Sequence, residues 1–545
     1  MPTPPGTASS VDVRPHPSKR RALHATRPFQ PGQVIHVFQQ PLILHPTADH
    51  LDSVCTYCLR PGSPRACSRC HAAFYCNAAC QRAGWAAIHR NECKALQRRT
   101  GSKTGADLPT PVRILLQALL EQGVERGLAD LEGHAERRSN AKAWADLEMM
   151  ATAACAFAGR GGDTARAIEL LCKIQTNAFH RLDEDLAGQV GIFLEPTLAM
   201  ANHSCIPNAT VLFMGRKAVL RAETAIQAGQ EIEISYTDYT SPRRVRQEAL
   251  GAYGFECRCP RCEHDLNVYQ VCSQSPDIPL NTYSVMGSKA SSALRDHPGA
   301  ANHALVGIAA RHCGELDASS TSASASAPGA RPGSKHALGA QLKACKALTD
   351  HELWAISPLP QILCEVSICL AREHNYAYAV AVSALAAVAC DPYRHVAPFH
   401  VVRLKNLLAV VKLLVLTAEE SAALRTSPRA TASSPTTGGG GLDDEARQAL
   451  ARIDQVSLSQ MLLVMIARME PAGCRGEWSP CVAAREMLED IGRLDGREKE
   501  LSLIDAWRHD GGSDASTRFF EYAVVEQMAA LAELGRSVLR EEFGV

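Results

Sequence analysis

The chain has 545 residues, of which 57 are basic and 57 acidic, so its formal net charge at neutral pH is zero. This balance argues against non-specific nucleic-acid binding as the main activity, because such binding needs an excess of positive charge. The length predicts more than one domain. No apolar run approaches the roughly 18 residues that a membrane span needs, so no membrane contact is expected.

Residues 1–17 are rich in proline and have no apolar core, which predicts a disordered tail rather than a signal peptide or an anchor. The chain contains 21 cysteines. Many of them fall into metal-ligand spacings and no export signal precedes them, so a reducing interior is expected, in the cytoplasm, the nucleus or both.

The segment 18–54 contains a turn at Pro31-Gly32, and Gln33 to Phe38 has strand character. It is followed by eight potential zinc ligands within 39 residues: Cys55, Cys58, Cys67, Cys70, Cys76, Cys80, His89 and Cys93. They predict two four-ligand zinc sites, and the spacing alone allows either sequential or interleaved pairing. The pairs Cys76/Cys80 and His89/Cys93 can each share one helix face. Metal must supply the folding energy of such a short segment, because it has few large apolar residues.

Apolar residues recur with a helical period between Pro111 and Leu171. Farther along, Val211 to Met214 and Lys217 to Ala222 flank Gly215-Arg216 and predict a hairpin. Glu231 to Tyr236 alternates apolar and polar residues, which predicts a half-buried strand that ends in a phenol.

The stretch A-N-H-S-C-I-P-N, from Ala201 to Asn208, contains Cys205, and C-x-C-x-x-C follows at Cys257, Cys259 and Cys262. One cysteine and three more predict a closed tetrahedral zinc site.

The remaining residues, 267–545, are interrupted by low-complexity segments at 318–333 and 427–441, which predict flexible insertions. Apolar stripes between and after them predict helices that pack as antiparallel pairs. The expected helices are Gln361–His374, Tyr376–Cys390, His400–Leu416, Glu445–Met469, Val482–Leu494 and Arg518–Glu542.

The N-H-S-C-x-P-N and I-S-Y-x-D motifs with the downstream cysteines resemble the C-terminal half of the SET domain of protein lysine methyltransferases. The eight-ligand segment resembles a MYND zinc finger, and a MYND finger placed between the two parts of a SET domain resembles the SMYD family. The resemblance implies an α+β fold in which a MYND finger and a helical insert split a SET-domain β-fold, followed by an all-α TPR-like domain. The implied boundaries are 1–17 for the tail, 18–54 for the SET N-terminal segment, 55–93 for the finger, 94–172 for the insert, 173–248 for the SET core, 249–266 for the post-SET zinc segment and 267–545 for the helical domain.

The same resemblance implies an S-adenosylmethionine-dependent protein-lysine N-methyltransferase that acts on histone or non-histone proteins and contains three zinc ions. Tyr236 is implied as the catalytic residue, with its hydroxyl directed at the transferring methyl and the lysine nitrogen. The implied cofactor-binding residues are Arg21, Asn177, Asn202, His203, Tyr236 and Phe255, and the implied walls of the lysine channel are Phe179, Tyr253 and Phe255. Interleaved ligation is implied for the finger: Cys55, Cys58, Cys76 and Cys80 on one metal, and Cys67, Cys70, His89 and Cys93 on the other.

The chain departs from the family at the K-G-x-G-L segment, where Arg20 and Ala22 replace the two glycines. Glycine serves where a side chain would clash or φ is positive, so the cofactor contact of this segment is open. Arg21 is a candidate for the cofactor's carboxylate, and an exposed basic residue is the alternative.

The expected partner is a protein substrate that presents a lysine from an extended peptide. Gln81 and Trp85 match positions where MYND fingers hold Pro-containing peptides, and local core is the alternative for Trp85. A monomer is expected, with nucleic-acid binding at most secondary. The rival to the enzyme is a MYND/TPR scaffold or transcriptional co-regulator around a weak or inactive SET domain.

Overall fold

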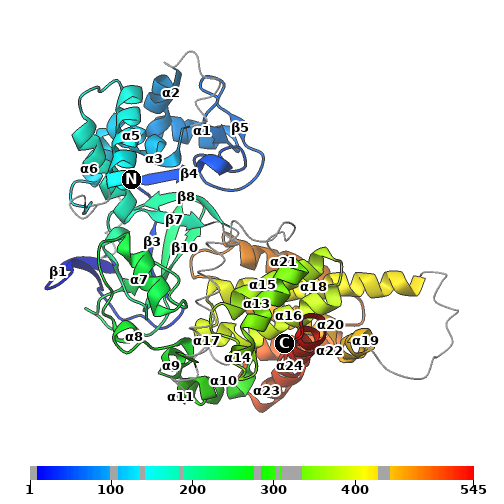
Figure 1. The fold of residues 1–545 in the computed structure, drawn as a ribbon. Helices are drawn as coiled ribbons and strands as arrows, with labels where there is room; N and C mark the ends of the chain where they lie inside the picture. Colours follow the sequence, from blue (N-terminus) through cyan, green and yellow to red (C-terminus); the bar gives the residue numbers. More distant parts are fainter. Residues whose placement is uncertain are drawn as a thin grey trace. The chain divides into compact units, whose positions relative to one another are not determined.

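The computed structural model describes residues 9–97, 108–134, 141–182, 188–274, 284–301, 306–307, 334–426 and 442–545. The chain divides into two compact units, the first formed by Met1–Thr237 with Val245–Cys257 and the second by Asp238–Arg244 with Arg258–Val545 (Figure 1). Short sheets and helices make up the first unit and helices the second, so the fold class is α+β, as predicted. The expected insertions at 318–333 and 427–441 lie outside the described residues.

The first unit opens with an antiparallel pair, β1 (Val11–His16) and β2 (Arg20–Ala25). The prediction of a disordered tail is therefore wrong for residues 11–16, while residues 1–8 lie outside the described part of the chain. Val11 supplies the reason, because its buried side chain joins the apolar cluster that also contains Leu23 and Ala25. The proline content of the segment concealed this strand, which pairs along its whole length with β2.

Two three-stranded sheets surround this apolar cluster. In one, β3 (Val34–Phe38) pairs with β11 (Lys217–Ala222), which forms a hairpin with β10 (Ala209–Met214). The strand near Gln33–Phe38 and the hairpin are thus confirmed. The second sheet has the order β4-β8-β7, with bounds Ile43–Pro46, Gln189–Leu194 and Phe179–Leu182.

The predicted strand over Glu231–Tyr236 is reduced to β12 (Glu233–Ile234), which pairs in parallel with β9 (Asn202–His203). The side chain of Asn208 takes over the adjacent main-chain pairing. Its Nδ2 donates to the Glu231 carbonyl at 2.9 Å, and its Oδ1 accepts from the Glu233 amide at 2.9 Å. The last residue of the N-H-S-C-I-P-N motif therefore holds the segment that leads to Tyr236.

The finger contains β5 (Arg65–Ala66), β6 (Phe74–Tyr75), α1 (Ala78–Gly84), a π-helical turn (Trp85–His89) and α2 (Arg90–Gln97). Cys76 precedes Asn77, which caps α1, so Cys76 and Cys80 flank the start of the helix instead of sharing one of its faces. That detail of the prediction is wrong, because Asn77 is the N-cap: its side chain accepts from the Cys80 amide, so the helix begins only after Cys76.

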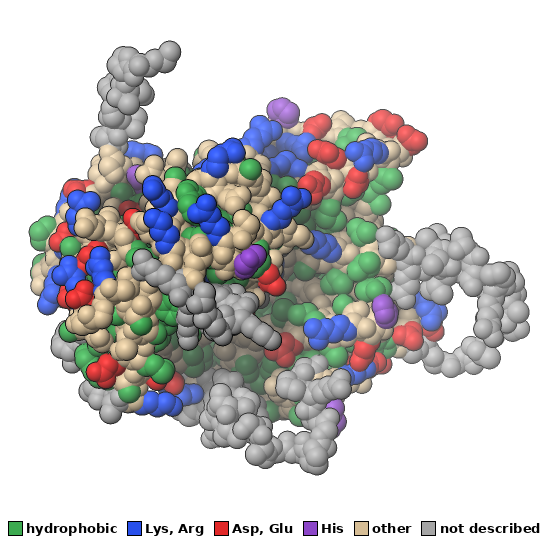
Figure 2. Space-filling model, turned by 90° about the horizontal axis from the view of Figure 1, so that it is seen from above, with side chains coloured by type: hydrophobic (Ala, Val, Ile, Leu, Met, Phe, Trp, Pro, Cys, Tyr) green, Lys and Arg blue, Asp and Glu red, His purple; other side chains and the backbone are tan. Residues whose placement is uncertain are grey.

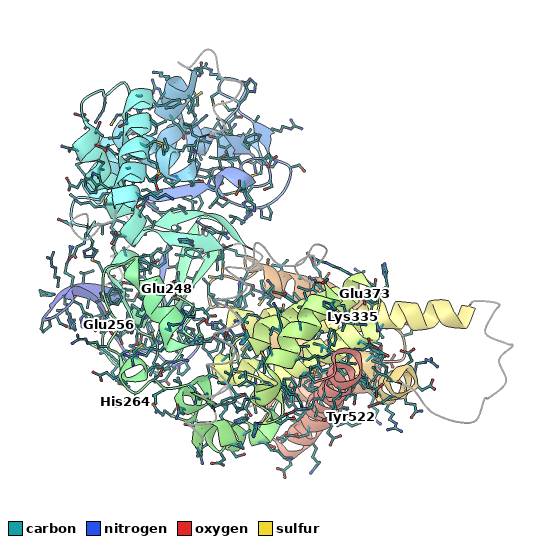
Figure 3. The ribbon with its side chains drawn as sticks, viewed as in Figure 1. Glu248, Glu256, His264, Lys335, Glu373 and Tyr522 are labelled. Carbon is teal, nitrogen blue, oxygen red and sulfur yellow. The ribbon has the colours of Figure 1, made fainter. Side chains whose placement is uncertain are left out.

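The helical insert was predicted from the 3.6-residue period and is confirmed. Its helices are α3 (Thr110–Leu120), α4 (Gln122–Gly127), α5 (Ala141–Ala158) and α6 (Thr164–Asn177). They share one apolar cluster with Ile43 and Leu194 of the second sheet, so the insert packs directly on the strands. After β12 comes α7 (Arg243–Gly251), where Glu248 is labelled in Figure 3.

The second unit is helical and is centred on α16 (Tyr376–Ala389), which packs against α15 (Leu359–Arg372), α18 (Val401–Thr426) and α24 (Gln527–Val538). Among the described residues, the other helices of eight or more residues are α13 (Lys335–Ala344), α19 (Leu442–Arg452), α20 (Gln455–Arg468), α21 (Ser479–Ile491) and α22 (Glu498–His509). The shorter ones are α8 (Pro260–Glu263), α9 (Val268–Ser273), α10 (Ala290–Arg295), α11 (Pro298–Ala301), α14 (Lys346–Thr349), α17 (Asp391–Arg394) and α23 (Asp514–Phe520), with π-helical turns at Glu521–Glu526 and Leu539–Phe543.

The helix expected over Glu445–Met469 is split into α19 and α20, which bend by 69° at the break. Asp454 causes the break, because its carboxylate accepts from the Ser457 amide at 3.0 Å and caps the second helix.

The segment Tyr376–Arg394 has the length and hydropathy of a membrane span, but 72% of it is buried inside the protein. Acidic and basic side chains are interspersed over the face seen in Figure 2. The TPR-like repeat stays a prediction.

Glu223, next to β11, yields a pH-dependent prediction. Burial raises the pKa of its carboxyl to about 7, against weaker opposing effects of Thr210 and Arg221. The folded protein therefore takes up a proton here, and its free energy of unfolding falls as pH rises from about 4.5 to about 7. Glu223→Gln should stabilise the protein at pH 8 by about 1–3 kcal/mol and change little at pH 4.5. Urea unfolding at both pH values measures this, and an equal effect at both would contradict it.

Candidate functional site

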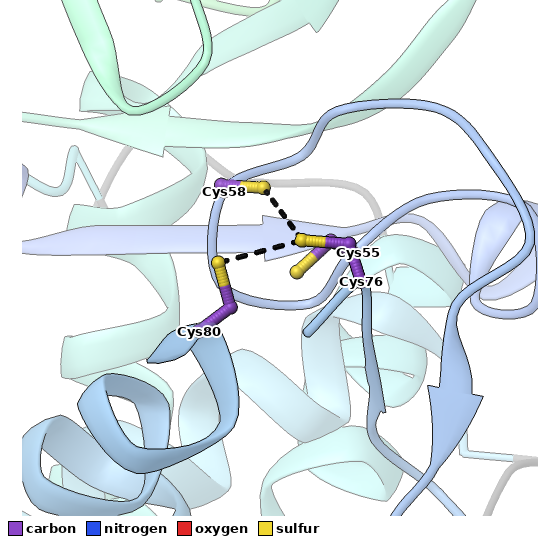
Figure 4. A group of neighbouring side chains, drawn as sticks. All are labelled: Cys55, Cys58, Cys76 and Cys80. Carbon is purple, nitrogen blue, oxygen red and sulfur yellow. Dashed lines mark hydrogen bonds between the residues drawn. The ribbon is translucent and has the colours of Figure 1, made fainter. Parts of the chain in front are cut away.

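Three groups of four ligand side chains converge in the described structure, and in each group the ligand atoms lie within 4.8 Å of one another. The first group is Cys55, Cys58, Cys76 and Cys80 (Figure 4), the second is Cys67, Cys70, His89 and Cys93, and the third is Cys205, Cys257, Cys259 and Cys262. The ligand sets of the finger are interleaved, as the family resemblance implied. Spacing alone left sequential pairing open, and the fold removes that alternative.

The spacing of the sulfur atoms fits zinc. Four thiolates at about 2.3 Å from a tetrahedral Zn²⁺ are separated by about 3.8 Å. In the first group the Sγ atoms of Cys58 and Cys76 are 3.8 Å apart, and those of Cys76 and Cys80 are 3.5 Å apart (Figure 4). In the third group Cys205 and Cys257 are 4.0 Å apart. Each group contributes four thiolate or imidazole ligands, the full set that a closed structural zinc site requires.

Tyr236 lies at the centre of a group of aromatic side chains. Its ring centroid is 4.9 Å from that of Tyr253, 5.4 Å from that of His203 and 6.4 Å from that of Phe255. The Tyr236 hydroxyl donates a hydrogen bond of 2.7 Å to the carbonyl of Ala201. Burial, followed by nearby Tyr253 and Glu231, raises the pKa of Tyr236 above its ordinary value, so the phenol is neutral at physiological pH.

The other channel residues differ in their surroundings. Phe255 keeps 37% of its surface exposed and contacts the His203 ring at 6.0 Å, so it lies at the edge of the aromatic group. Phe179 makes its ring contact with Phe213 at 6.3 Å, at the rim of the apolar cluster that Tyr236 also touches. The structure thus brings Tyr253 and Phe255 to Tyr236 and places Phe179 against the sheet.

The polar residues proposed for the cofactor hold elements of the first unit together. Asn202 Nδ2 donates to the Arg21 carbonyl and to Glu231 Oε1, both at 2.9 Å. Both ring nitrogens of His203 are engaged, Nδ1 with the Tyr236 amide and Nε2 with the Cys205 sulfur. Glu231 was not singled out from the sequence, although it joins the segments that carry Asn202 and Lys19.

Arg21 and Asn177 lie around the loop at residues 129–134. The Arg21 guanidinium donates to the Asp130 carbonyl, and Asn177 Nδ2 donates to the Glu132 carbonyl at 2.7 Å. Arg20 has a φ of 62°, the left-handed conformation that glycine adopts freely. The arginine therefore preserves the backbone conformation at the first missing glycine, and its side chain extends to Glu132 at 3.2 Å. Ala22 is fully buried.

Comparison with known proteins agrees with this geometry. The MYND finger family model matches residues 55–93. The histone-lysine N-methyltransferase ASHR1 of Arabidopsis thaliana is 30% identical over 262 residues, which is 46% of this chain and 54% of the relative. Over this part of its length the chain is also similar to SMYD proteins. Human N-lysine methyltransferase SMYD2 is 30% identical over 264 residues, covering 45% of this chain and 58% of SMYD2.

A further relative is the SET domain and MYND-type zinc finger protein 6 of Schizosaccharomyces pombe, which is 32% identical over 227 residues, or 41% of this chain and 46% of that protein. The chain thus matches about half the length of these curated relatives. A crystal structure of the SET domain of LSMT bound to lysine and AdoHcy aligns over 93% of both chains at 12% identity, with a TM-score of 0.23. With so low a TM-score, this alignment carries no argument about the fold or function of the chain.

A buried carboxylate connects the finger to the helical insert. Glu92 Oε2 accepts from His89 Nδ1 at 2.7 Å, and Glu92 Oε1 accepts from Arg113 Nε and Gln117 Nε2, both at 2.9 Å. All four side chains are at least 97% buried. Burial alone would raise the pKa of Glu92, but Arg113 and His89 hold it well below its ordinary value. A carboxylate that accepts from a metal-binding histidine fixes the orientation of its ring.

Glu92→Ala should therefore lower the free energy of unfolding by about 3–5 kcal/mol, because it leaves the Arg113 charge buried without its carboxylate. Chemical denaturation followed by circular dichroism measures the change. Glu148→Ala, on the exposed face of α5, is the matched control and should have little effect. A loss below about 1 kcal/mol for Glu92→Ala would show that the finger and the insert are not coupled through this carboxylate.

Proposed function

We propose that this protein is an S-adenosylmethionine-dependent protein-lysine N-methyltransferase that acts on histone or non-histone lysines. The observation that carries the proposal is the set of groups that surround Tyr236. A neutral phenol, oriented by the Ala201 carbonyl, is grouped with Tyr253 and Phe255. The A-N-H-S-C segment supplies both Ala201 and the His203 ring beside the phenol. The names of the curated relatives support the same reaction class.

The cofactor supplies a methyl group that is already activated on a sulfonium. The protein therefore needs no electrophilic catalyst, and its contribution is positioning, which can lower the barrier by about 7–11 kcal/mol. The Tyr236 hydroxyl donates its hydrogen bond to the Ala201 carbonyl oxygen, so the lone pairs of the phenol oxygen remain available to the reacting groups. Because its pKa is raised, Tyr236 acts as a neutral hydrogen-bonding group and not as a phenolate base.

The substrate lysine must arrive as the free amine. We assign the walls of its channel to Tyr253, Phe255 and Phe179. Burial between aromatic rings disfavours the ammonium form and so lowers the lysine pKa. The exposed edge of Phe255 marks the entrance.

We assign cofactor binding to Arg21, Asn177, Asn202, His203, Tyr236 and Phe255. The Nδ2 atoms of Asn177 and Asn202 and the ring nitrogens of His203 are already bonded within the protein. These residues therefore fit a site in which their main chains contact the cofactor and their side chains fix those main chains. Arg21, half-buried beside Asp130, supplies positive charge suited to a carboxylate.

The proposal is tested by methyl transfer from labelled S-adenosylmethionine to a peptide array that includes histone tails, with lysines replaced by arginine in parallel spots. Label should appear on lysine peptides and vanish in the arginine spots. Transfer to peptides without lysine would contradict the assignment.

The finer expectations about partners belong to the same proposal. Gln81 and Trp85 are proposed to hold Pro-containing peptides, and Trp85 is half-buried, with Arg69 above its ring at 5.4 Å. We propose a monomer in the cytoplasm, the nucleus or both. The rival is a scaffold with a weak or inactive SET domain. The scaffold hypothesis is based on Arg20 and Ala22, which stand in place of two glycines. A measurement of cofactor binding decides between the scaffold and the active enzyme.

A further inference from the structure

We infer that His203 is a positioning residue, which ties the third metal group to the main chain of Tyr236, and that Arg246 is the second hydrogen-bond donor to the same thiolate. The inference rests on the proposed function for its effect on catalysis. Its structural part stands on contacts among Cys205, His203, Tyr236 and Arg246.

The hydrogen bonds fix the tautomer of His203. The Tyr236 amide lies 3.0 Å from His203 Nδ1, and a main-chain amide can only donate, so Nδ1 accepts and carries no proton. The proton of the neutral ring is therefore on Nε2, which lies 3.2 Å from the sulfur of Cys205. The ring, buried at 7% exposure, thus accepts from the tyrosine amide on one side and donates to the thiolate on the other.

A second donor reaches the same sulfur from α7. Arg246 is 1% exposed, and its Nε donates to Cys205 Sγ at 3.2 Å. Gln247, the next residue, holds the main chain of Cys257 with its side-chain amide: Nε2 donates to the Cys257 carbonyl at 2.8 Å, and Oε1 accepts from the Cys257 amide at 3.0 Å. Helix α7 therefore supports two of the four ligands. Four thiolates around one Zn²⁺ carry a net charge of −2, which a buried guanidinium and an N–H donor stabilise.

These contacts fix Tyr236 at two points from one segment. The Ala201 carbonyl holds its hydroxyl and the His203 ring holds its amide. Because the ring orientation of His203 depends on the Cys205 thiolate, the metal group sets the position of the tyrosine backbone as well as the path of the downstream loop.

Two substitutions at residue 203 separate the two contacts. In His203→Asn the amide oxygen can replace Nδ1 as the acceptor for Tyr236, but the shorter side chain no longer supplies a donor to the Cys205 sulfur. In His203→Gln the longer side chain can replace Nε2 as the donor to the sulfur, but the acceptor for Tyr236 is lost. Arg246→Leu removes the other donor, Arg246→Lys restores a charged N–H donor, and Arg243→Leu, at an exposed position of the same helix, is the control.

Two measurements test the inference without any reference to activity. His203→Asn and Arg246→Leu should each speed zinc release to a chromophoric chelator by about tenfold, with one ion per chain affected and Arg246→Lys close to the wild type. His203→Gln, but not His203→Asn, should raise hydrogen exchange at the Tyr236 amide. In the active enzyme His203→Gln should lower kcat about tenfold with little change in KM. A wild-type protein without methyl transfer would reject the proposed function but leave these two measurements valid.

Unchanged zinc release in both His203→Asn and Arg246→Leu would overturn the inference, as would equal exchange at Tyr236 in the Gln and Asn variants. Circular dichroism checks that each variant is folded. If both variants at residue 203 fail to fold, the Arg246→Leu and Arg246→Lys pair still decides whether the thiolate depends on a second donor.

Discussion

Replacing Tyr236 by phenylalanine should lower kcat about a hundredfold or more, while zinc content and fold are unchanged. The substitution removes one hydroxyl, which is the group oriented by Ala201 at 2.7 Å. Loss of one well-placed polar group at a reacting centre typically costs about 10²–10³ in rate. The phenyl ring keeps the contacts with His203, Tyr253 and Phe255, so the apolar packing around it should persist.

The measurement is kcat for wild type and variant with one lysine peptide, together with zinc content and the thermal midpoint. Tyr522→Phe is the matched control, because Tyr522 is 57% exposed and lies in the helical unit (Figure 3). It should leave kcat unchanged. A rate for Tyr236→Phe within about threefold of the wild type would remove the tyrosine from the mechanism.

Cys259→Ser should release one zinc ion of three and reduce activity about 10–100-fold. A serine hydroxyl is a poor ligand for zinc in a thiolate site, and the third group has only four ligands, so the loss of one opens it. The segment that carries Phe255 ends two residues later at Cys257, which belongs to the same group. Opening the group should therefore loosen Phe255 at the edge of the Tyr236 site.

Metal analysis by mass spectrometry gives the zinc count, and kcat gives the loss of activity. Cys364→Ser is the control, because Cys364 is an exposed thiol outside the three groups and should leave all three ions bound. Retention of three ions by Cys259→Ser would show that Cys259 is not a ligand. Loss of one ion with full activity would refute the link between this metal and the active site.

Local sequence patterns were sufficient for the elements that depend on neighbours in the chain. The hairpin around Gly215-Arg216 formed as expected because its turn and alternation are local. The helix starts at Asn77 and Asp454, which side chains cap, were not predicted. The composition of the surrounding segment does not show where a capping residue interrupts the helical period. The strand at Val11–His16 was missed for a similar reason, because only its pairing with β2 reveals it.

In the candidate site, too, local sequence identifies some residues, whereas others are identified only by contacts between distant segments. Its ligands and Tyr236 could be named from motifs, because those residues carry the chemistry directly. The residues that hold them in place, Glu92, Arg246, Asn208 and Glu231, act through contacts between segments far apart in the chain. No spacing rule connects Glu92 to Arg113 or Arg246 to Cys205. For His203 the motif marked the residue, but only the structure shows that its ring is directed at a sulfur and an amide.

We propose that Asn202, His203 and Arg21 frame a working cofactor site although Arg20 and Ala22 replace two glycines. Titration calorimetry of the zinc-loaded, full-length protein with S-adenosylmethionine tests it most directly. We expect one site per chain, filled at tens of micromolar ligand or below, with S-adenosylhomocysteine competing for it. If a folded protein with three zinc ions gives no heat of binding in that range, the methyltransferase assignment is contradicted and the scaffold hypothesis is favoured.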